Sequence, residues 1–440
     1  MTAGFSRIDI TPPLDRIEAY GLGYWYQRSI RFTGVRDPLY VRSLALNDGL
    51  RRQLIISVDS ILDTYAFVPQ ATPQISAMLN VEPSAVFITC THTHSSPLIE
   101  RNGTAEGAEY GMFLTERIVQ SALKASENSV PARISISQER VVDVLYNRRP
   151  LLRNGQIAEL HKGVAPEDIA DAGAVNDVMT IVKMRGDDGE LLGGLCHFGI
   201  HGVAVQCSDL ISSDCMGRAI QAAERQSGGV MLHLNGACGD IDPILMGSDE
   251  ALDEMSRRLF EGIQAVITAA ERPLADGGAL ETAAASFDAK RRTTRAAAAL
   301  KDARATLGRG SDLTAAGSHH SGAGYQLFLL SEEARVSAMP PTFPIAYQLL
   351  GFGGVLLAGI GGEVFTRSGL ELQRSAPGIT LLPVGLTGGA AGYLPTREMY
   401  AQGGYETACA QWCTIAPGET ERLFAQIKGD VERVTEGVTR

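Results

Sequence analysis

The chain has 440 residues, of which 45% are hydrophobic, and its mean hydropathy is close to zero. This is enough apolar material for a large core. The formal net charge of −11 repels nucleic-acid backbones and anionic membrane surfaces. We therefore expect a globular protein that acts on a small-molecule substrate and has no nucleic-acid partner.

The sequence also bears on where the protein acts. Its first residues have neither the basic region nor the apolar region of a secretory signal. The longest apolar stretch is far shorter than the roughly 20 residues that span a bilayer. The seven cysteines are scattered without a CxxC pair, which favours a reducing compartment. We expect a cytoplasmic protein without stable membrane association, and we leave homo-oligomerisation open.

Several short apolar runs, typical of β-strands, are each followed by a glycine-rich or polar loop. The runs are residues 85–88, 191–200, 230–234 and 355–360. A helix is predicted after residue 214, with a serine cap at its start and Gly228 at its end. No periodic repeat is evident. The pattern predicts an α/β (mixed α+β) fold with its site at the C-terminal ends of strands.

The later part of the chain contains one segment that differs from this pattern. A helix is predicted from residue 290 to about 305, followed by a glycine- and serine-rich stretch at about residues 308–324. We expect this stretch to be a mobile surface insertion. No low-complexity linker divides the chain, so residues 1–440 are expected to form a single catalytic domain.

His92 and His94 follow the first apolar run, in the sequence THTHSSP. Alternate residues of an extended chain point to the same side, so the two imidazoles are expected to project together. Neutral imidazoles are good ligands for zinc. The spacing indicates a metal or catalytic site, although two hydrogen-bonded histidines would give the same pattern.

A second pair, His197 and His201, follows the next apolar run. The spacing of four residues suits a helical metal site, but Gly199 and Gly202 argue against a helix. We expect one of the two to be a ligand. A buried histidine bonded to the backbone is the alternative.

Carboxylates follow the remaining runs. Asp240 and Asp242 lie in the turn GDIDP, where they can act as a general base or orient a histidine. Glu363 follows two glycines and can either enter a metal shell or cap a helix. An ordinary acidic turn explains the first segment equally well on local grounds.

Taken together and in this order, these segments resemble the neutral ceramidase family, the zinc-dependent amidases that cleave N-acylsphingosine. The resemblance begins at residues 4–12 (GFSRIDITP), which match the family's opening motif. It continues through residues 91–95 (THTHS), 146–148 (YNR), 198–201 (FGIH), 210–214 (LISSD), 239–243 (GDIDP), 362–363 (GE) and 392–406 (GY to YE). The motifs extend over nearly the whole chain.

The resemblance implies a set of site residues and a ceramidase-like catalytic domain. Zinc is expected at four ligands, namely His92, His201, Glu363 and Tyr393. On the substrate side, the matching residues are His94, Asn147, Arg148 and Tyr405. His197 is then expected to lie in the core or behind the ligands.

Two features depart from the family. The family serine in Gly-Asp-x-Ser-Pro is replaced by Asp242. In addition, neither the signal peptide nor the C-terminal immunoglobulin-like domain of secreted members is expected here. The first departure favours direct attack by metal-bound water, with Asp242, or alternatively Asp240, accepting the proton. His94, Arg148 and Tyr405 would stabilise the oxyanion or protonate the leaving amine.

The sequence therefore predicts a zinc-dependent hydrolase, and a small soluble amide is the favoured substrate. Ester or lactone hydrolysis, and ceramide cleavage itself, are the alternatives within this class. Two other classes remain, a metal-binding homologue without catalysis and a metal-dependent isomerase or lyase. Turnover that is lost in His92→Ala and Asp242→Ala would eliminate the first. Incorporation of 18O from water into product would argue against the second.

Overall fold

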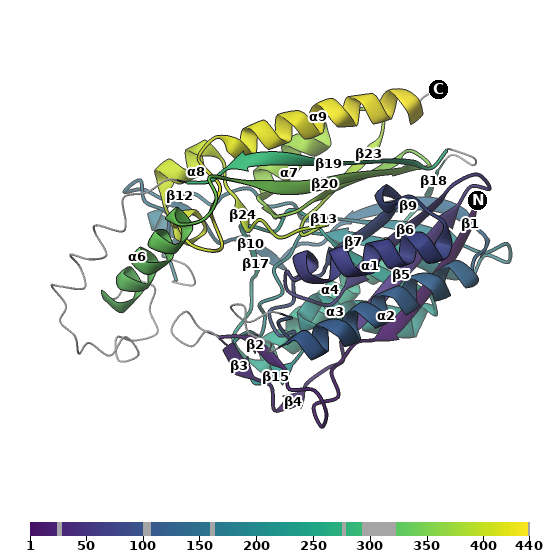
Figure 1. Cartoon of the computed structure of the whole chain (residues 1–440), viewed down its shortest axis with the longest axis horizontal. Coiled ribbons are helices and arrows are strands. Elements are labelled where there is room, and N and C mark those ends of the chain that lie inside the picture. The colour runs from purple at the N-terminus through teal and green to yellow at the C-terminus, as the bar shows by residue number, and fades with distance from the viewer. Residues whose placement is uncertain (24–28, 100–106, 159–162, 275–278, 293–322, 439–440) are drawn as a thin grey trace.

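Three β-sheets with helices packed against them form the framework of the computed structural model (Figure 1). The structure describes residues 1–23, 29–99, 107–158, 163–274, 279–292 and 323–438. In each sheet three main strands are antiparallel neighbours in chain order, and a fourth pairs in parallel with the third. A helix links the third strand to the fourth, because a parallel pair needs a crossover, and another helix follows. We call each such unit a module.

The three modules follow one another along the chain. Module 1 contains β1 (Thr2–Asp9), β5 (Tyr40–Asn47), β6 (Arg52–Val58), α1 (Thr64–Leu79), β7 (Val86–Cys90) and α2 (Ala108–Glu127). Module 2 contains β9 (Arg133–Arg140), β13 (Val178–Arg185), β14 (Leu191–Phe198), α3 (Asp214–Ser227), β16 (Val230–Asn235) and α4 (Asp249–Thr268). Module 3 contains β19 (Glu281–Lys290), β20 (Thr342–Phe352), β21 (Val355–Ile360), α7 (Thr366–Arg374), β23 (Thr380–Val384) and α9 (Glu419–Val438).

Shorter elements complete the fold. Two-residue strands β8 (Val130–Pro131) and β18 (Arg272–Pro273) extend the first two sheets beside β1 and β9. Two-stranded pairs are β2 (Tyr20–Leu22) with β3 (Ser29–Arg31), β4 (Gly34–Val35) with β15 (Leu210–Ile211), β10 (Leu145–Asn147) with β17 (Ile241–Pro243), β11 (Leu151–Leu152) with β12 (Ile169–Asp171), and β22 (Glu363–Val364) with β24 (Tyr393–Leu394). Within the described residues, the remaining α-helices are α6 (Ala323–Ser337) and α8 (Arg397–Gln402).

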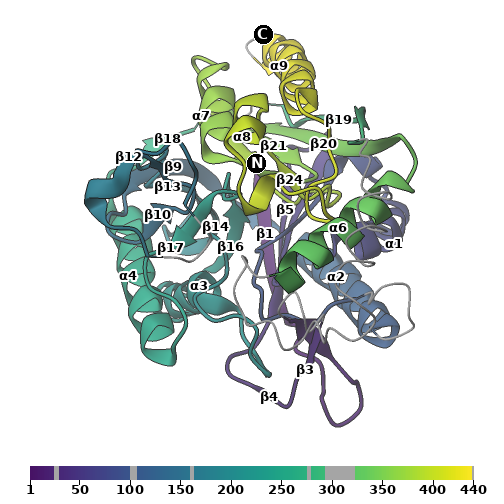
Figure 2. The same ribbon diagram turned by 90° about the vertical axis from the view of Figure 1, so that its left-hand side faces the viewer.

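The inner faces of the three sheets meet in one shared core, around which the modules are arranged (Figure 2). Successive side chains of a strand point to opposite faces. In β5, for example, Leu44 and Leu46 enter the shared core, whereas Val41 and Ala45 face the helices of module 1. The shared core draws on all three sheets and includes Phe5, Leu44, Ile55, Ile136, Leu195, Leu234, Leu357 and Leu382.

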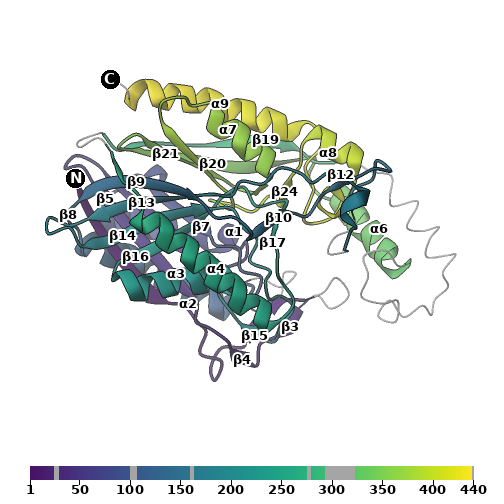
Figure 3. The same cartoon turned by 180° about the vertical axis from the view of Figure 1, so that it is seen from behind.

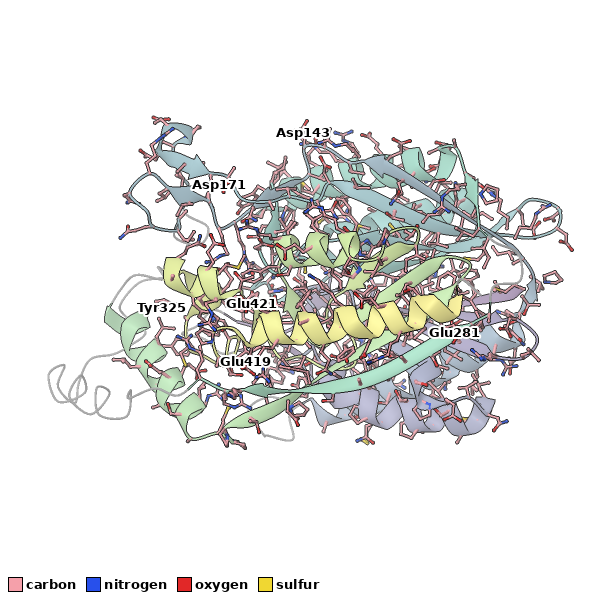
Figure 4. All side chains as sticks on the ribbon, turned by 90° about the horizontal axis from the view of Figure 1, so that it is seen from above. Asp143, Asp171, Glu281, Tyr325, Glu419 and Glu421 are labelled. Carbon is pink, nitrogen blue, oxygen red and sulfur yellow. The ribbon has the colours of Figure 1, made fainter. Side chains whose placement is uncertain are left out.

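Each sheet is covered on its outer face by the two helices of its own module (Figures 1 and 3). Strands buried on both faces read as continuous apolar runs, which explains the runs in the sequence. Helix α9 lies along β19 and β20, with Glu419 and Glu421 in its first turn and Glu281 near its other end (Figure 4). The Glu419 carboxylate accepts the N–H of Lys290 at the end of β19.

The mixed α/β prediction is confirmed. The four apolar runs form β7, β14, β16 and β21, and α3 ends at Gly228, which has a φ of 78°. The predicted serine cap is wrong, because the Ser213 hydroxyl accepts no backbone N–H of the helix and donates instead to Asp37. The helix predicted from residue 290 is wrong at its start, because Lys290 ends β19. The rest of that segment, and most of the insertion expected at about residues 308–324, lies outside the described residues.

The recurrence of the module is a property of the structure that the sequence did not reveal.

No helix within the described part of the chain is both long and apolar enough to cross a membrane.

Candidate active site

The carboxyl ends of the parallel strand pairs of all three modules point toward β10, β17 and β24 (Figure 1). His92 follows β7 of module 1, His201 follows β14 of module 2, and Glu363 follows β21 of module 3. All three side chains are buried. Each module therefore contributes one potential metal ligand.

The two histidines are held in the same way by backbone carbonyl groups. The Nδ1–H of His92 donates to the Ile61 carbonyl over 2.7 Å, and that of His201 donates to the Cys238 carbonyl over 2.7 Å. In this tautomer the Nε2 atom of each ring carries a free lone pair. Backbone hydrogen bonds of this kind fix the orientation of metal-binding imidazoles.

The backbone at His92 does not follow the extended path on which the sequence argument relied. Strand β7 ends at Cys90, and His92 has a φ of 70°, in the left-handed region. Its N–H donates to the Ser60 carbonyl over 2.9 Å, which stabilises this conformation. Such strain is uncommon outside glycine and often marks functional sites. His92 and His94 are still brought together, but by a turn.

Three lone-pair atoms converge between the modules. The Oε2 atom of Glu363 lies 3.3 Å from Nε2 of His92 and 3.3 Å from Nε2 of His201. Within the described residues, neither His201 Nε2 nor Glu363 Oε2 has a hydrogen-bond partner. Buried acceptors that face one another are the arrangement expected of metal ligands.

His94 lies at the more open edge of this group. Its Nε2 atom is 3.4 Å from Nε2 of His92, and the side chain is half-buried. Its possible ligand atom lies within 4.8 Å of those of His92 and His201. The Nδ1 atom has no hydrogen-bond partner within the described part of the chain. Burial, together with the neighbouring histidines, lowers the pKa of His94 well below its ordinary value.

Arg148 connects the segments around the three ligands. Its guanidinium donates to Asp242 over 3.0 Å, to Glu406 over 2.8 Å, to the Gly239 carbonyl over 3.0 Å and to the Tyr393 hydroxyl over 2.8 Å. Glu406 is also bound by Arg149. Arg148 therefore donates to four acceptors of the protein itself. The sequence analysis had predicted that it contacts the substrate.

The two aspartates of the GDIDP turn occupy different environments. Asp240 accepts hydrogen bonds from Asn147 and from the backbone and hydroxyl of Thr366, at the start of α7. Asn147 also binds the Ala174 carbonyl and the Arg149 N–H. Both residues therefore have internal structural partners.

Asp242 is fully buried and bound by Arg148. One of its carboxylate oxygens lies 3.9 Å from Nδ1 of His201, the ring nitrogen that faces away from Glu363. Tyr146, its partner in the β10–β17 pair, also makes a side-chain hydrogen bond to it. Asp242 therefore lies behind the His201 ring with respect to the three converging atoms.

Two tyrosines lie beside this group. Tyr393 is the register partner of Glu363 in the β22–β24 pair, and its ring centroid is 6.5 Å from that of His201. Burial raises the pKa of Tyr393 well above its ordinary value. Tyr405 packs edge-on against Tyr393, and Trp412 stacks on Tyr405 at 4.8 Å. The aromatic stack thus fixes Tyr405 next to a predicted ligand.

The charges near the converging atoms also suit a cation. Among the described residues, the contacts of Arg148 and the converging atoms comprise two buried guanidinium groups and four buried carboxylates, namely Arg148, Arg149, Asp240, Asp242, Glu363 and Glu406. When all are ionised, the negative charges exceed the positive ones by two. A divalent cation would restore neutrality, and unbalanced buried charge is costly. Two imidazole nitrogens and a carboxylate oxygen are ligands that zinc accepts.

Comparison with known proteins identifies the family. Residues 1–249 match the family model described as neutral/alkaline non-lysosomal ceramidase, N-terminal. The chain belongs to this family. The resemblance found in the sequence is thereby confirmed, and the protein is a hydrolase by family. A search of curated proteins finds no match.

Ceramidase structures share the fold. Neutral ceramidase from Pseudomonas aeruginosa superposes with a TM-score of 0.70 at 19% identity, covering 98% of this chain and 75% of that chain. A structure described as ceramidase complexed with C2 gives a TM-score of 0.73 at 20% identity, again covering 98% of this chain and 75% of that chain. At such identities the likeness concerns the fold alone.

Two charged residues of the candidate site carry no local signal in the sequence. Glu406 pairs with both Arg148 and Arg149, yet Glu406 was named only as the end of the motif at residues 392–406, and Arg149 was not named at all. The charge of Arg148 could have prompted a search for a buried acidic partner. Nothing local identifies Glu406 as that partner, because it lies 258 residues away.

Proposed function

We propose that this protein is a zinc-dependent hydrolase that cleaves the C–N amide bond of a small substrate. The observation that carries the proposal is the convergence of His92 Nε2, His201 Nε2 and Glu363 Oε2, of which the last two have no hydrogen-bond partner within the described residues. Membership of a hydrolase family supports the reaction class. The excess of buried negative charge supports a divalent metal.

His92, His201 and Glu363 would hold the metal, with Tyr393 as a fourth ligand. When bound, zinc lowers the pKa of water and polarises a substrate carbonyl. The hydrogen bond from Arg148 to the Tyr393 hydroxyl oxygen would stabilise negative charge on that phenol. Arg148 is itself held by Asp242 and Glu406, so these carboxylates fix the donor.

We assign proton transfer to His94. Its Nδ1 atom has no partner within the described residues. A general base must lie within reach of the reacting group, and His94 lies at the open edge of the converging atoms. Asp242 lies behind His201, where it orients Arg148. Asp240 is less suited to be a base, because both of its oxygens are engaged.

The substrate is proposed to be a small soluble amide whose carbonyl lies between His94 and Tyr405. The strongly negative surface charge disfavours an anionic membrane as the substrate source. An ester or lactone would react by the same chemistry, and ceramide is the remaining alternative in this class.

Metal analysis and a substrate panel test the proposal. Purified protein should contain about one zinc per chain, and chelation should abolish hydrolysis until zinc is restored. N-acyl amino acids, N-acyl amines, simple esters, lactones and detergent-dispersed ceramide are the substrates to compare. One oxygen of the product acid should come from 18O-labelled water. Metal binding without turnover, or a product without label, would contradict a hydrolase.

Matched variants locate the activity. His92→Ala should lose both the metal and turnover. The control is His197→Gln, which changes a buried histidine whose Nε2 is bound to the Pro383 carbonyl. This control should retain the metal and turnover. His94→Ala should keep its metal and lower kcat by roughly 10²–10⁴-fold, the usual range for a general base. If Asp242→Asn lowered kcat as much while Arg148 stayed in place, Asp242 would be the base instead.

A further inference from the structure

Asn235 makes an arrangement of hydrogen bonds that the proposed chemistry does not use. It is the last residue of β16 in module 2, and its side chain is fully buried. The Nδ2 group donates to the Thr91 carbonyl over 3.0 Å and to the Ile200 carbonyl over 3.0 Å. The Oδ1 atom accepts the N–H of Ile200 over 3.1 Å.

These partners directly precede the two histidines. The Thr91 carbonyl belongs to the peptide group that leads into His92, and the Ile200 carbonyl belongs to the one that leads into His201. One amide nitrogen therefore holds both peptide groups, which come from different modules. The backbone carbonyl of Asn235 also accepts the N–H of Gly385, which follows β23 of module 3. A single residue thus joins the loops of all three modules next to the converging atoms.

The chemistry of the side chain matters as much as its position. Both amide protons and the amide oxygen are used, so the orientation of the group is fixed. An aspartate has the same shape but no proton to donate, and its carboxylate would face two carbonyl oxygens. The resulting repulsion would push the His92 and His201 loops apart.

We propose that Asn235 is a positioning residue that sets the spacing of the His92 and His201 imidazoles and thereby the affinity of the site for its metal. This inference rests on the metal site of the proposed function. Outer-shell hydrogen bonds to ligand segments typically change metal affinity by roughly 10–100-fold. We expect a loss in this range.

The test compares Asn235→Asp with a matched control, Gln53→Glu. Gln53 is also fully buried, and its amide nitrogen donates to two backbone carbonyl groups, those of Glu281 and Gly351. It lies near the start of β6, at the opposite end of that strand from the ligands. Zinc affinity is measured by competition with a chromophoric chelator, and the melting temperature is measured on the metal-free proteins.

Asn235→Asp should bind zinc at least tenfold more weakly than the wild type, whereas Gln53→Glu should lose melting temperature but keep wild-type affinity. If Asn235→Asp does not fold, Asn235→Ser, which keeps one donor, should show a smaller loss of affinity. A folded Asn235→Asp variant that binds zinc with wild-type affinity would overturn this inference but leave the proposed function intact. Equal loss of affinity in the control would also overturn it, since that would reflect general destabilisation. A wild-type protein that binds no divalent metal would overturn the proposed function and this inference together.

Discussion

Arg148 shows how the site depends on single buried charges. Its guanidinium binds two carboxylates, a backbone carbonyl and a phenol, each in a different direction. A planar fork with five donors suits this task, whereas a lysine ammonium is a compact charge on a flexible stem. The residue type is therefore as important as the charge.

We expect Arg148→Lys to destabilise the fold by about 3 kcal/mol, because one ammonium cannot pair both Asp242 and Glu406 and a buried carboxylate is left without its partner. Urea unfolding measures the change. The matched control is Arg257→Lys on the exposed face of α4, where Arg257 pairs with Glu254 and Glu261. The control should change stability by no more than about 0.5 kcal/mol. Equal effects of the two changes would contradict the role assigned to Arg148.

Two other buried histidines make stability depend on pH. Burial lowers the pKa of His197 and of His233 to about 4, from 6.5. Between these values the unfolded chain binds more protons than the folded one, so stability falls as the pH falls. Above about pH 6.5 both histidines are neutral in the folded and the unfolded chain, and this effect is absent. As the pH falls toward 4, the free energy of unfolding decreases by roughly 3 kcal/mol for each histidine.

We therefore expect His233→Gln to flatten the pH dependence of stability. The free energy of unfolding is measured in urea between pH 7 and pH 4.5 for the wild type and the variant. The variant should lose less stability over this range, since glutamine does not titrate. A parallel decline in both proteins would show that His233 is not the cause.

The sequence predicted those site residues that follow apolar strands. His92, His201 and Glu363 each follow such a run, and local pattern was enough to select them as candidates. Their convergence came only from the family resemblance. The contact of Arg148 with Glu406 and the bridge made by Asn235 depend on tertiary structure, because their partners lie 258 and up to 144 residues away.

At the scale of elements, burial decided which predictions succeeded. Strands β7 and β21 are buried on both faces along their whole length, and their apolar runs were recognised. The pairs β10–β17 and β22–β24 contain only two or three residues per strand, which is too short for a periodic signal. These short pairs nevertheless hold Asp242, Glu363 and Tyr393. The short elements that hold part of the candidate site were therefore the hardest to predict.

Two glycines, one at a helix end and one inside a helix, provide a test of backbone effects free of side-chain crowding. Gly228 ends α3 with a φ of 78°, and Gly429 lies inside α9; a methyl group added at either would meet no atom within 4 Å. Gly228→Ala should destabilise the protein by about 1 kcal/mol, because alanine resists the left-handed conformation. Gly429→Ala should stabilise it by roughly 0.5–1 kcal/mol, because glycine is a poor helix former. Melting temperatures that shift in the same direction would contradict this account.

At the scale of the whole molecule, the three modules depend on one another. Their outer faces are covered by their own helices, but their inner faces meet only in the shared core. The proposed metal site has the same organisation, with one ligand from each module. Buried ion pairs also cross between modules, since Arg42 of β5 binds Glu224 of α3. Folding and assembly of the site are therefore expected to be one cooperative process.

We expect a fragment of residues 1–131, which holds module 1 with β8, not to fold alone. Its inner face would expose five large side chains, namely Phe5, Leu44, Leu46, Ile55 and Phe87. Burying a side chain of this size contributes about 1.5–3 kcal/mol, so the loss of five approaches the roughly 5–15 kcal/mol that stabilises a typical domain. The fragment should lack near-ultraviolet circular dichroism and cooperative thermal unfolding, both of which the full chain should show. A fragment with dispersed amide resonances and a sharp unfolding transition would mean that each module is a domain, and that the metal site lies between domains.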